Sequence, residues 1–287
     1  MHLPRLRSLM SLLASASLLG GAALASTSGA QLGSSAGGGP VVDAAIRPVF
    51  VSSCIGYCKH PTNAGKVFRW GLEAWEEEAE HRHLDNRWRS NHPGLVNNQY
   101  GMLTITARPQ TNEVRTHPVN NKAAYGRWEA RVRAVELEKG NKTFRFNWEL
   151  VPVRKQSRCG ARGIVLTSYH PGDDKVARGA VRAHGRSFSF GRKVDLRSRA
   201  WHTYAVEVTK RHISWFVDTK VVRTEKRDAA LSGVKLRPRF RIVAARHGRM
   251  NLSRMQMDWV RYYDLHRPNA KSISAPKMRA RTYAKGC

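Results

Sequence analysis

The central segment Ser157–Gly172, SRCGARGIVLTSYHPG, combines arginines, hydroxyl groups, a cysteine and a tyrosine, and it contains no carboxylate. The first acidic residue before it is Glu149, and the first after it is Asp173. General acid–base chemistry by paired carboxyl groups is therefore excluded from this segment. The Ser and Thr hydroxyls in the segment have no carboxylate nearby in the sequence to complete a nucleophile–base–acid set, which argues against nucleophilic catalysis there.

The elements that must position this segment alternate polar and apolar residues with a period of two. Residues 101–107 and 125–135 follow this pattern, and a turn at Asp218–Lys220 joins two further strands in a hairpin. In the second of these segments the residues expected to face inward are Trp128, Ala130, Val132 and Ala134, and those expected to face outward are Arg127, Glu129, Arg131 and Arg133. Many strands of modest length predict an all-β protein, an antiparallel β-sandwich of the jelly-roll type. One helical-looking segment, residues 71–83, is expected to form a short exposed helix or loop.

Composition shifts divide the 287 residues into four parts. Residues 1–25 have a positive start, an apolar stretch and a small-residue cleavage site, and they predict a signal peptide. Residues 26–44 are a Gly/Ser-rich linker, residues 45–266 a single domain, and residues 267–287 a basic flexible tail. The mature chain is expected to be secreted, extracellular or associated with a cell wall, without a transmembrane segment.

The charge of the chain is strongly positive. Fifty Lys and Arg residues against 21 Asp and Glu residues give a formal net charge of +29. Such a field attracts polyanions, which include nucleic acid, anionic polysaccharide, cell-wall polymers and acidic membrane surfaces. Because arginines occur in every strand-like segment, the tail alone does not account for the excess.

Four cysteines in an exported chain favour disulfides, and they allow three pairings. Cys54 and Cys58 are candidates for a bond that closes a tight loop, which would leave Cys159 and Cys287 as the second pair. A zinc site at this loop is disfavoured because the spacing matches no standard set of four ligands. We expect no metal and no cofactor.

Several segments resemble the family 16 glycoside hydrolases of the laminarinase and licheninase group. They are YGRWEARVRA at 125–134, WHTYAVEVTKRHISWFVDTKVVRT at 201–224 and MDWVRYYDL at 257–265, preceded by NNQYGMLTITA. They keep their order and extend over most of residues 95–265. The resemblance implies a concanavalin-like jelly roll.

The resemblance also implies a catalytic strand that carries Glu-x-Asp followed by a second Glu. Retaining hydrolysis needs a nucleophilic carboxylate and an acid/base carboxyl group about 5–5.5 Å apart. In the best register Gly163 stands at the nucleophile, Val165 at the assisting Asp, and Thr167 or Ser168 at the acid/base. No register supplies an acid, so no catalytic residue is predicted, and Glu149 is the candidate for a relocated acid. The family's structural calcium has no acidic loop to bind it here.

The candidate ligand-binding residues are Trp148, Arg162, Tyr169 and His184. Jelly-roll proteins bind sugars by stacking aromatic rings on the pyranose face and adding a few polar contacts, and an arginine suits an anionic sugar or phosphate. The alternatives are that Trp148 belongs to the core, that Tyr169 caps a turn, and that His184 and Arg162 are solvated. The function predicted is non-catalytic polysaccharide binding, anionic polysaccharides included.

Two other functions remain open. A hydrolase could use Glu149, Asp173, Asp174 or Glu129 as relocated acids, and a lyase acting on uronic acid polymers could use Tyr169 or His184 as its base. A polyanion-binding or cell-wall-binding protein driven by the +29 charge is the second alternative.

Overall fold

The structure is a computed structural model, and it describes residues 63–278 with several gaps. The gaps are 81–83, 85, 139–143, 155–162, 172–174, 184–185, 197–198, 227–229, 232 and 245–249. The predicted signal peptide, the linker and the four cysteines lie outside the described residues, and so do Arg162 and His184.

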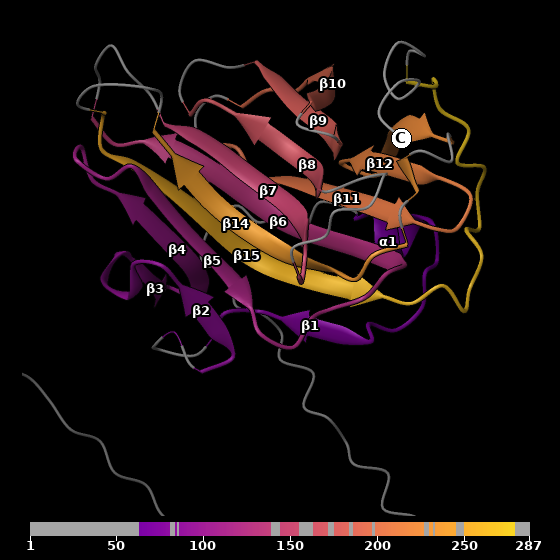
Figure 1. The fold of residues 1–287 in the computed structure, drawn as a ribbon, viewed down its shortest axis with the longest axis horizontal. Coiled ribbons are helices and arrows are strands. Elements are labelled where there is room, and N and C mark those ends of the chain that lie inside the picture. The colour runs from indigo at the N-terminus through magenta and orange to yellow at the C-terminus, as the bar shows by residue number, and fades with distance from the viewer. Residues whose placement is uncertain are drawn as a thin grey trace, which may run out of the picture. The chain divides into compact units, whose positions relative to one another are not determined.

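Two antiparallel sheets make up the described part of the chain (Figure 1). The larger sheet has the order β13 (Lys220–Glu225), β12 (Ile213–Val217), β11 (His202–Val208), β6 (Gly126–Glu136), β15 (Ser253–Tyr263), β4 (Met102–Ala107) and β3 (Val96–Gln99), and β1 (Trp75–Glu77) pairs with β15. The smaller sheet has the order β10 (Arg186–Lys193), β9 (Val176–Ala183), β8 (Gly163–Tyr169), β7 (Arg145–Pro152), β14 (Leu236–Val243), β5 (Glu113–Pro118) and β2 (Trp88–Ser90). The predicted all-β sandwich is confirmed.

Helical structure in the described residues is limited to α1 (Ala64–Val67) and the 3-10 turn η1 (Pro93–Leu95). No helix among these residues is long and apolar enough to span a membrane.

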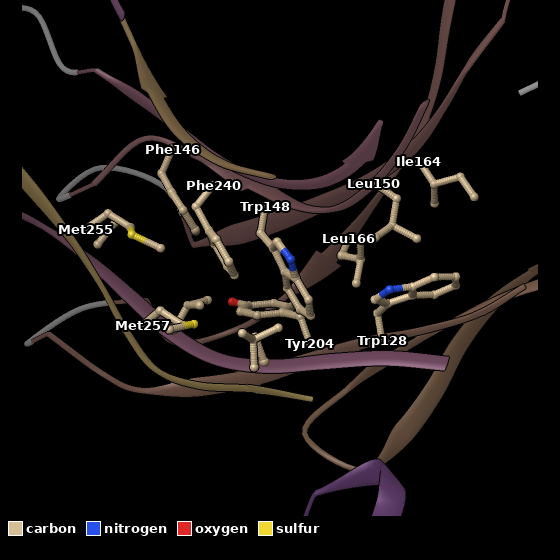
Figure 2. Packing of buried hydrophobic residues seen from close by; sticks show 14 of the residues in the cluster. Trp128, Phe146, Trp148, Leu150, Ile164, Leu166, Tyr204, Phe240, Met255 and Met257 are labelled. Atoms are coloured by element: carbon tan, nitrogen blue, oxygen red, sulfur yellow. The ribbon is translucent and has the colours of Figure 1, made fainter. Parts of the chain in front are cut away.

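The hydrophobic core lies between the two sheets. Figure 2 shows Trp148 and Phe240 side by side, directed from the smaller sheet toward Met257 and Tyr204 of the larger one. The rings of Trp148 and Phe240 are stacked with centroids 5.7 Å apart. The residues expected to face inward on β6 do so, since Trp128 is fully buried, as are its alternate neighbours.

The outer face of the larger sheet is covered rather than solvated. A second apolar cluster lies there, formed by Ala64, Phe68, Trp70, Ala205, Phe216 and Tyr263. Glu129, which was expected to face outward on β6, accepts hydrogen bonds from the backbone N–H groups of Ala64 and Gly65. Burial raises the pKa of Glu129 to about 7, although these two hydrogen bonds oppose the shift. The alternation on β6 is therefore as predicted, but Glu129 on its polar side packs under α1.

The acidic segment at residues 71–83 differs from the expected exposed helix or loop. Trp75–Glu77 forms β1, which pairs antiparallel with β15. Glu77 is buried and accepts a hydrogen bond from Nε1 of Trp88 at 3.4 Å. The reason for the difference is that β15 offers a free edge at this point and Trp88 a buried donor, and neither is visible in the local sequence.

The predicted flexible tail is wrong for residues 267–278, which pack along the larger sheet. The backbone of Thr224 on β13 exchanges hydrogen bonds with Pro276 and Met278. Asn269 accepts a hydrogen bond from Nε1 of Trp70 at 2.5 Å and donates to Glu207. The segment is held by these long-range bonds, which the basic and proline-containing local sequence does not reveal.

Replacing Asn269 with alanine is expected to lower the free energy of unfolding by about 2 kcal/mol, because the buried indole N–H of Trp70 loses its acceptor. Urea unfolding followed by tryptophan fluorescence measures the loss. Lys271→Ala, at an exposed position of the same segment, is the control and is expected to change little. Equal effects of the two substitutions would mean that the tail does not contribute to folding.

Candidate functional site

Strand register decides which residues of β7 and β8 share a face. Residues directly opposite in an antiparallel pair point to the same side. Trp148 opposes Thr167 on the core side, whereas Glu149 opposes Val165 and Asn147 opposes Ser168 on the outer side. The register shifts between Trp148 and Glu149. This bulge places Val165 and Ser168 on one face although they are three positions apart.

Of the positions expected to carry the family's acids, Gly163, Val165 and Ser168 lie on the outer face of the smaller sheet. Thr167, the alternative to Ser168, is fully buried on the core side. A Cβ at Gly163 would lie 3.4 Å from the carbonyl oxygen of Leu150, an ordinary contact. The sheet thus leaves room for a larger side chain where glycine stands.

Trp215 on β12 fixes this strand to the opposite sheet. Its indole Nε1 donates to the carbonyl oxygen of Val165 at 2.9 Å, in the core. The strand at the centre of the candidate site is therefore held from behind by a buried tryptophan, and its outer face is presented by a rigid support.

Glu149 on β7 lies directly beside Val165 and is surrounded by guanidinium groups. Its Oε1 accepts from Nε and Nη2 of Arg239 at 2.9 and 2.6 Å and lies 3.0 Å from Nε of Arg241. Its Oε2 accepts from Arg182. The Glu149 side chain is 1% exposed, against 33, 23 and 20% for the side chains of Arg182, Arg239 and Arg241. A carboxylate that is buried and bonded to three guanidinium groups is not free to approach a substrate, so Glu149 is poorly placed as a general acid.

Arginines dominate the outer face of the smaller sheet. Its basic and polar side chains include Arg89, Arg115, Arg145, Arg178, Arg182, Lys193, Arg237, Arg239 and Arg241, together with His117, Asn147 and Ser168. We call this surface the arginine face. In the described strands of this sheet the carboxylate side chains are Glu113 and Glu149. Glu113 is bonded to Arg115 at 2.7 Å and to Arg241 at 2.9 Å.

The surplus of positive charge contributes to shifts in the pKa values of neighbouring ionisable groups. Burial lowers the pKa of His117 to about 4, helped by Arg237, Arg239, Arg115 and Arg89, so the imidazole is neutral at pH 7. Burial alone would raise the pKa of Glu113, but the hydrogen bond and charge of Arg241 outweigh it and lower that pKa. Burial also lowers the pKa of Arg237, and the charge of Arg239 adds to this.

The neutral His117 makes stability depend on pH. Because the unfolded chain takes up this proton near pH 6.5 and the folded chain only near pH 4, stability falls as pH decreases from 7.5 to 4.5. After allowance for solvent screening we expect His117 to account for about 2 kcal/mol of that fall. Urea unfolding of the wild type and His117→Gln at both pH values measures it. An equal pH dependence in the two proteins would contradict the assignment.

The sequence-predicted site residues separate into three groups. Trp148 and Tyr169 lie in the core, 0% and 2% exposed, so the prediction that they line a sugar-binding surface is wrong for these two. Their rings face the opposite sheet because Trp148 stacks on Phe240 and Tyr169 packs edge-on against Phe146. Arg162, His184, Cys54 and Cys58 lie outside the described residues, and only Glu149 is both described and on the outer face.

The other residues proposed as relocated acids or bases are either poorly placed for catalysis or outside the described residues. Burial raises the pKa of the Tyr169 phenol above its ordinary value, and the ring is enclosed in the core. Glu129 lies under α1 on the larger sheet, away from β8. Asp173 and Asp174 are outside the described residues. Within the described part of the chain, His, Cys, Asp and Glu side chains form no group of three that could hold a metal ion.

Sequence reasoning missed the arginines of β14. Arg237, Arg239 and Arg241 alternate with Leu236, Phe240 and Ile242 in LRPRFRIV, so the strand and its two faces were readable. No local signal in the sequence shows which strand lies beside it. In the structure β14 pairs with β7, which places Arg239 opposite Glu149.

Comparison with known proteins agrees with this geometry. The family model described as "Glycosyl hydrolases family 16" matches residues 167–261. The solved laminarinase from Rhodothermus marinus shares 17% identity with the chain, with a TM-score of 0.56 over 67% of this chain and 96% of that one. The chain has the family 16 glycoside hydrolase fold. No curated protein sequence matches it.

Two further structures have the same fold. The laminarinase from Flavobacterium sp. UMI-01 is 17% identical, with a TM-score of 0.56 over 67% of this chain and 100% of that one. The endo-beta-1,3-glucanase from Pyrococcus furiosus is 13% identical, with a TM-score of 0.57 over 67% and 94%. The family 16 model match begins at Thr167 and so leaves out Gly163 and Val165, the first two positions of the expected acidic motif.

Proposed function

We propose that this chain is an exported polysaccharide-binding protein that uses the family 16 fold without glycosidase activity. The observation that carries the proposal is the composition of the outer face of β8, where Gly163, Val165 and Ser168 stand at the expected acid positions. Glycine and valine offer no ionisable group. The Ser168 hydroxyl accepts a hydrogen bond from Arg145 at 3.4 Å, and the nearby base His170 contacts the same arginine through Nε2. A hydroxyl group does not replace the carboxyl pair that glycosidic cleavage needs.

Glycosidic bond cleavage needs two carboxyl groups on either side of the bond, one of them able to donate a proton. In the described strands of the smaller sheet the carboxylates are Glu113 and Glu149, and both are bonded to arginines. Although burial opposes it, the bond with Arg241 lowers the pKa of Glu113, which is the opposite of what a general acid requires, and the guanidinium groups around Glu149 occupy its carboxylate oxygens. The charges on this face therefore support binding better than hydrolysis.

Polysaccharides are the proposed ligands because the solved proteins that share the fold are named laminarinases and endo-beta-1,3-glucanases, which act on such polymers. Fold alone does not determine function, so this step rests on the site as well. The outer face of a sheet, with side chains from neighbouring strands in register, suits an extended chain molecule better than a small compact one.

An active hydrolase or lyase with relocated residues is the competing function. The observation in its favour is that Glu149 lies directly opposite Val165, within the region expected to be catalytic. Its burial and its three guanidinium partners argue against it, since a substrate would have to displace arginines to reach the carboxylate.

The proposal is tested by binding the full mature chain to a panel of polysaccharides. The panel contains a β-1,3-glucan, a galactan, a polyuronate and a sulfated galactan, and affinity electrophoresis and calorimetry report binding. We expect at least one polysaccharide to slow the protein in the gel, with the polymer recovered at its original length. Failure to bind any member of the panel would overturn the proposal.

Export is a separate part of the proposal and has its own test. If residues 1–25 act as a signal peptide, the protein recovered from the medium of a secreting host begins at Ser26. Retention of the intact N-terminus in cell-bound protein would contradict it.

A further inference from the structure

The arginines of the arginine face are unequally engaged. Arg182, Arg239 and Arg241 are held by Glu149, and Arg241 also bonds Glu113. Arg237, two positions before Arg239 on β14, makes no ion pair in the described part of the chain, and its buried Nε has no hydrogen-bond partner there. A buried donor without an acceptor costs free energy, so an acceptor group of a ligand would stabilise the Arg237 side chain.

Arg178 on β9 is the second arginine of this kind. Its side chain is exposed, and it makes no ion pair with any described residue. It lies on the same face as Arg182, four residues before it on the same strand, and opposite Gly191 of β10. The two less engaged arginines therefore lie on opposite sides of the arginines that Glu149 holds.

The net charge of the face is large. Eight arginines and Lys193 against two glutamates leave a formal excess of seven positive charges, and the low pKa of His117 keeps that ring neutral. The side chains of Arg182, Arg239 and Arg241 are partly exposed, so the guanidinium groups reach solvent although their carboxylate partner does not. A guanidinium group binds carboxylate and sulfate oxygens through two parallel hydrogen bonds.

Aromatic platforms are missing from this face. The described outer-face positions of β2, β5, β7, β8, β9, β10 and β14 include no Trp, Tyr or Phe, because the aromatic residues of these strands alternate into the core. Neutral sugars and nucleobases are both bound mainly by stacking on such rings. The described face thus has the groups that bind anions and lacks those that bind neutral sugars.

We propose that the arginine face binds a polysaccharide bearing repeated carboxylate or sulfate groups, with Arg237 and Arg178 among the residues that contact those groups. This inference rests on the proposed polysaccharide-binding function and names its ligand class. Along β14 the three arginines extend over about 13 Å, since alternate residues of a strand are about 6.6 Å apart. Such a row matches a polymer with several charges better than a single anion. Glu149 acts as a fixed counter-ion that orients Arg182, Arg239 and Arg241.

The test compares two matched double variants of the full mature chain. Arg178→Ala/Arg237→Ala removes two charges from the arginine face. Arg69→Ala/Arg211→Ala removes two charges from exposed positions beside α1 and in the β11–β12 turn of the larger sheet. Calorimetry at about 0.15 M salt, where surface charges are screened beyond about 8 Å, measures affinity for polygalacturonate, a sulfated galactan, laminarin and duplex DNA.

We expect the arginine-face variant to bind at least one of the two anionic polysaccharides about tenfold more weakly than the wild type, a change of about 1.4 kcal/mol. The control variant is expected to stay within about twofold of the wild type, because its arginines lie off the face. The polygalacturonate and sulfated galactan arms distinguish a carboxylate ligand from a sulfate ligand. Unfolding curves check that both variants are folded, and Arg178→Lys/Arg237→Lys, which keeps the charge but loses the paired donors, is expected to bind with intermediate affinity.

Several results would overturn the inference. Tight laminarin binding without preference for anionic polymers would refute it while leaving the proposed polysaccharide-binding function intact. Equal losses in the two double variants, or DNA binding as tight as polysaccharide binding, would mean that net charge alone drives association. Binding of none of the polysaccharides would remove both the inference and the proposed function.

Discussion

Replacing Glu149 with glutamine is expected to lower the free energy of unfolding by about 3 kcal/mol, one of the two largest effects predicted for a single substitution. The carboxylate is 1% exposed and balances the charges of Arg182, Arg239 and Arg241. Glutamine keeps the shape but not the charge, so three neighbouring guanidinium groups would repel one another. Because these groups are partly exposed, the expected loss stands at the lower end of the range for a broken buried ion pair. Urea unfolding at neutral pH measures it.

Glu113→Gln is the matched control on the same sheet. Its side chain is 22% exposed and binds Arg115 and Arg241, so the expected loss is about 1 kcal/mol. If Glu149→Gln is no less stable than the wild type, Glu149 is not a structural counter-ion. A group kept for reactivity rather than for folding would then be the better explanation.

Trp148→Ala is expected to cost about 4 kcal/mol, because the fully buried indole fills the space between the sheets and its loss leaves a cavity. The stacked contact with Phe240, at 5.7 Å between centroids, is lost as well. Trp148→Phe retains part of the packing and is expected to lose less stability. Thermal and urea unfolding of both variants measure the difference.

Tyr100→Ala provides the control, since Tyr100 is 96% exposed and its removal is expected to leave stability within about 0.5 kcal/mol of the wild type. The result also tests the role of Trp148 in binding. As a core residue it affects ligand affinity only through folding. A Trp148→Phe variant with wild-type stability and lost polysaccharide binding would contradict its placement in the core.

Strand periodicity was sufficient to predict the fold. Alternation in residues 101–107 gave the buried face of β4, where Leu103, Ile105 and Ala107 are fully enclosed. The same pattern gave the inward face of β6, because side chains alternate across a pleated strand whatever its neighbours are. The sequence alone also shows that the segment forming β8 carries no acid, since no Asp or Glu lies between Glu149 and Asp173.

The composition of the site could not be predicted, because it depends on pairing between distant strands. The contact of Glu149 with Arg239 joins residues 90 positions apart, and that with Arg182 joins residues 33 positions apart. Likewise, the choice between Thr167 and Ser168 depends on a bulge in the β7–β8 pair, which sequence spacing does not reveal. The sequence favoured Trp148 and Tyr169 as aromatic residues that stack on a sugar, but the strand register places both side chains in the core.

The arginine face is a defined surface that carries part of the positive charge of the chain. A net charge of +29 by itself predicts attraction to any polyanion. Eight arginines on one sheet face, two of them with neither an ion pair nor a side-chain hydrogen bond to a described residue, instead predict a defined surface with residue-specific effects. A family 16 fold with arginines around β8, a strand that carries no acid, is the basis of our proposal that the protein holds a charged polymer rather than cleaving it.

The release of reducing ends is the measurement that tests the central claim most directly. The purified full-length mature chain is incubated with β-glucans, a galactan, a polyuronate and a sulfated galactan, and new reducing ends are counted over time. We predict no release above the buffer blank from any polymer, including those that the protein binds. Release that grows in proportion to protein concentration would contradict the account, and its loss in Glu149→Gln would identify Glu149 as the residue responsible.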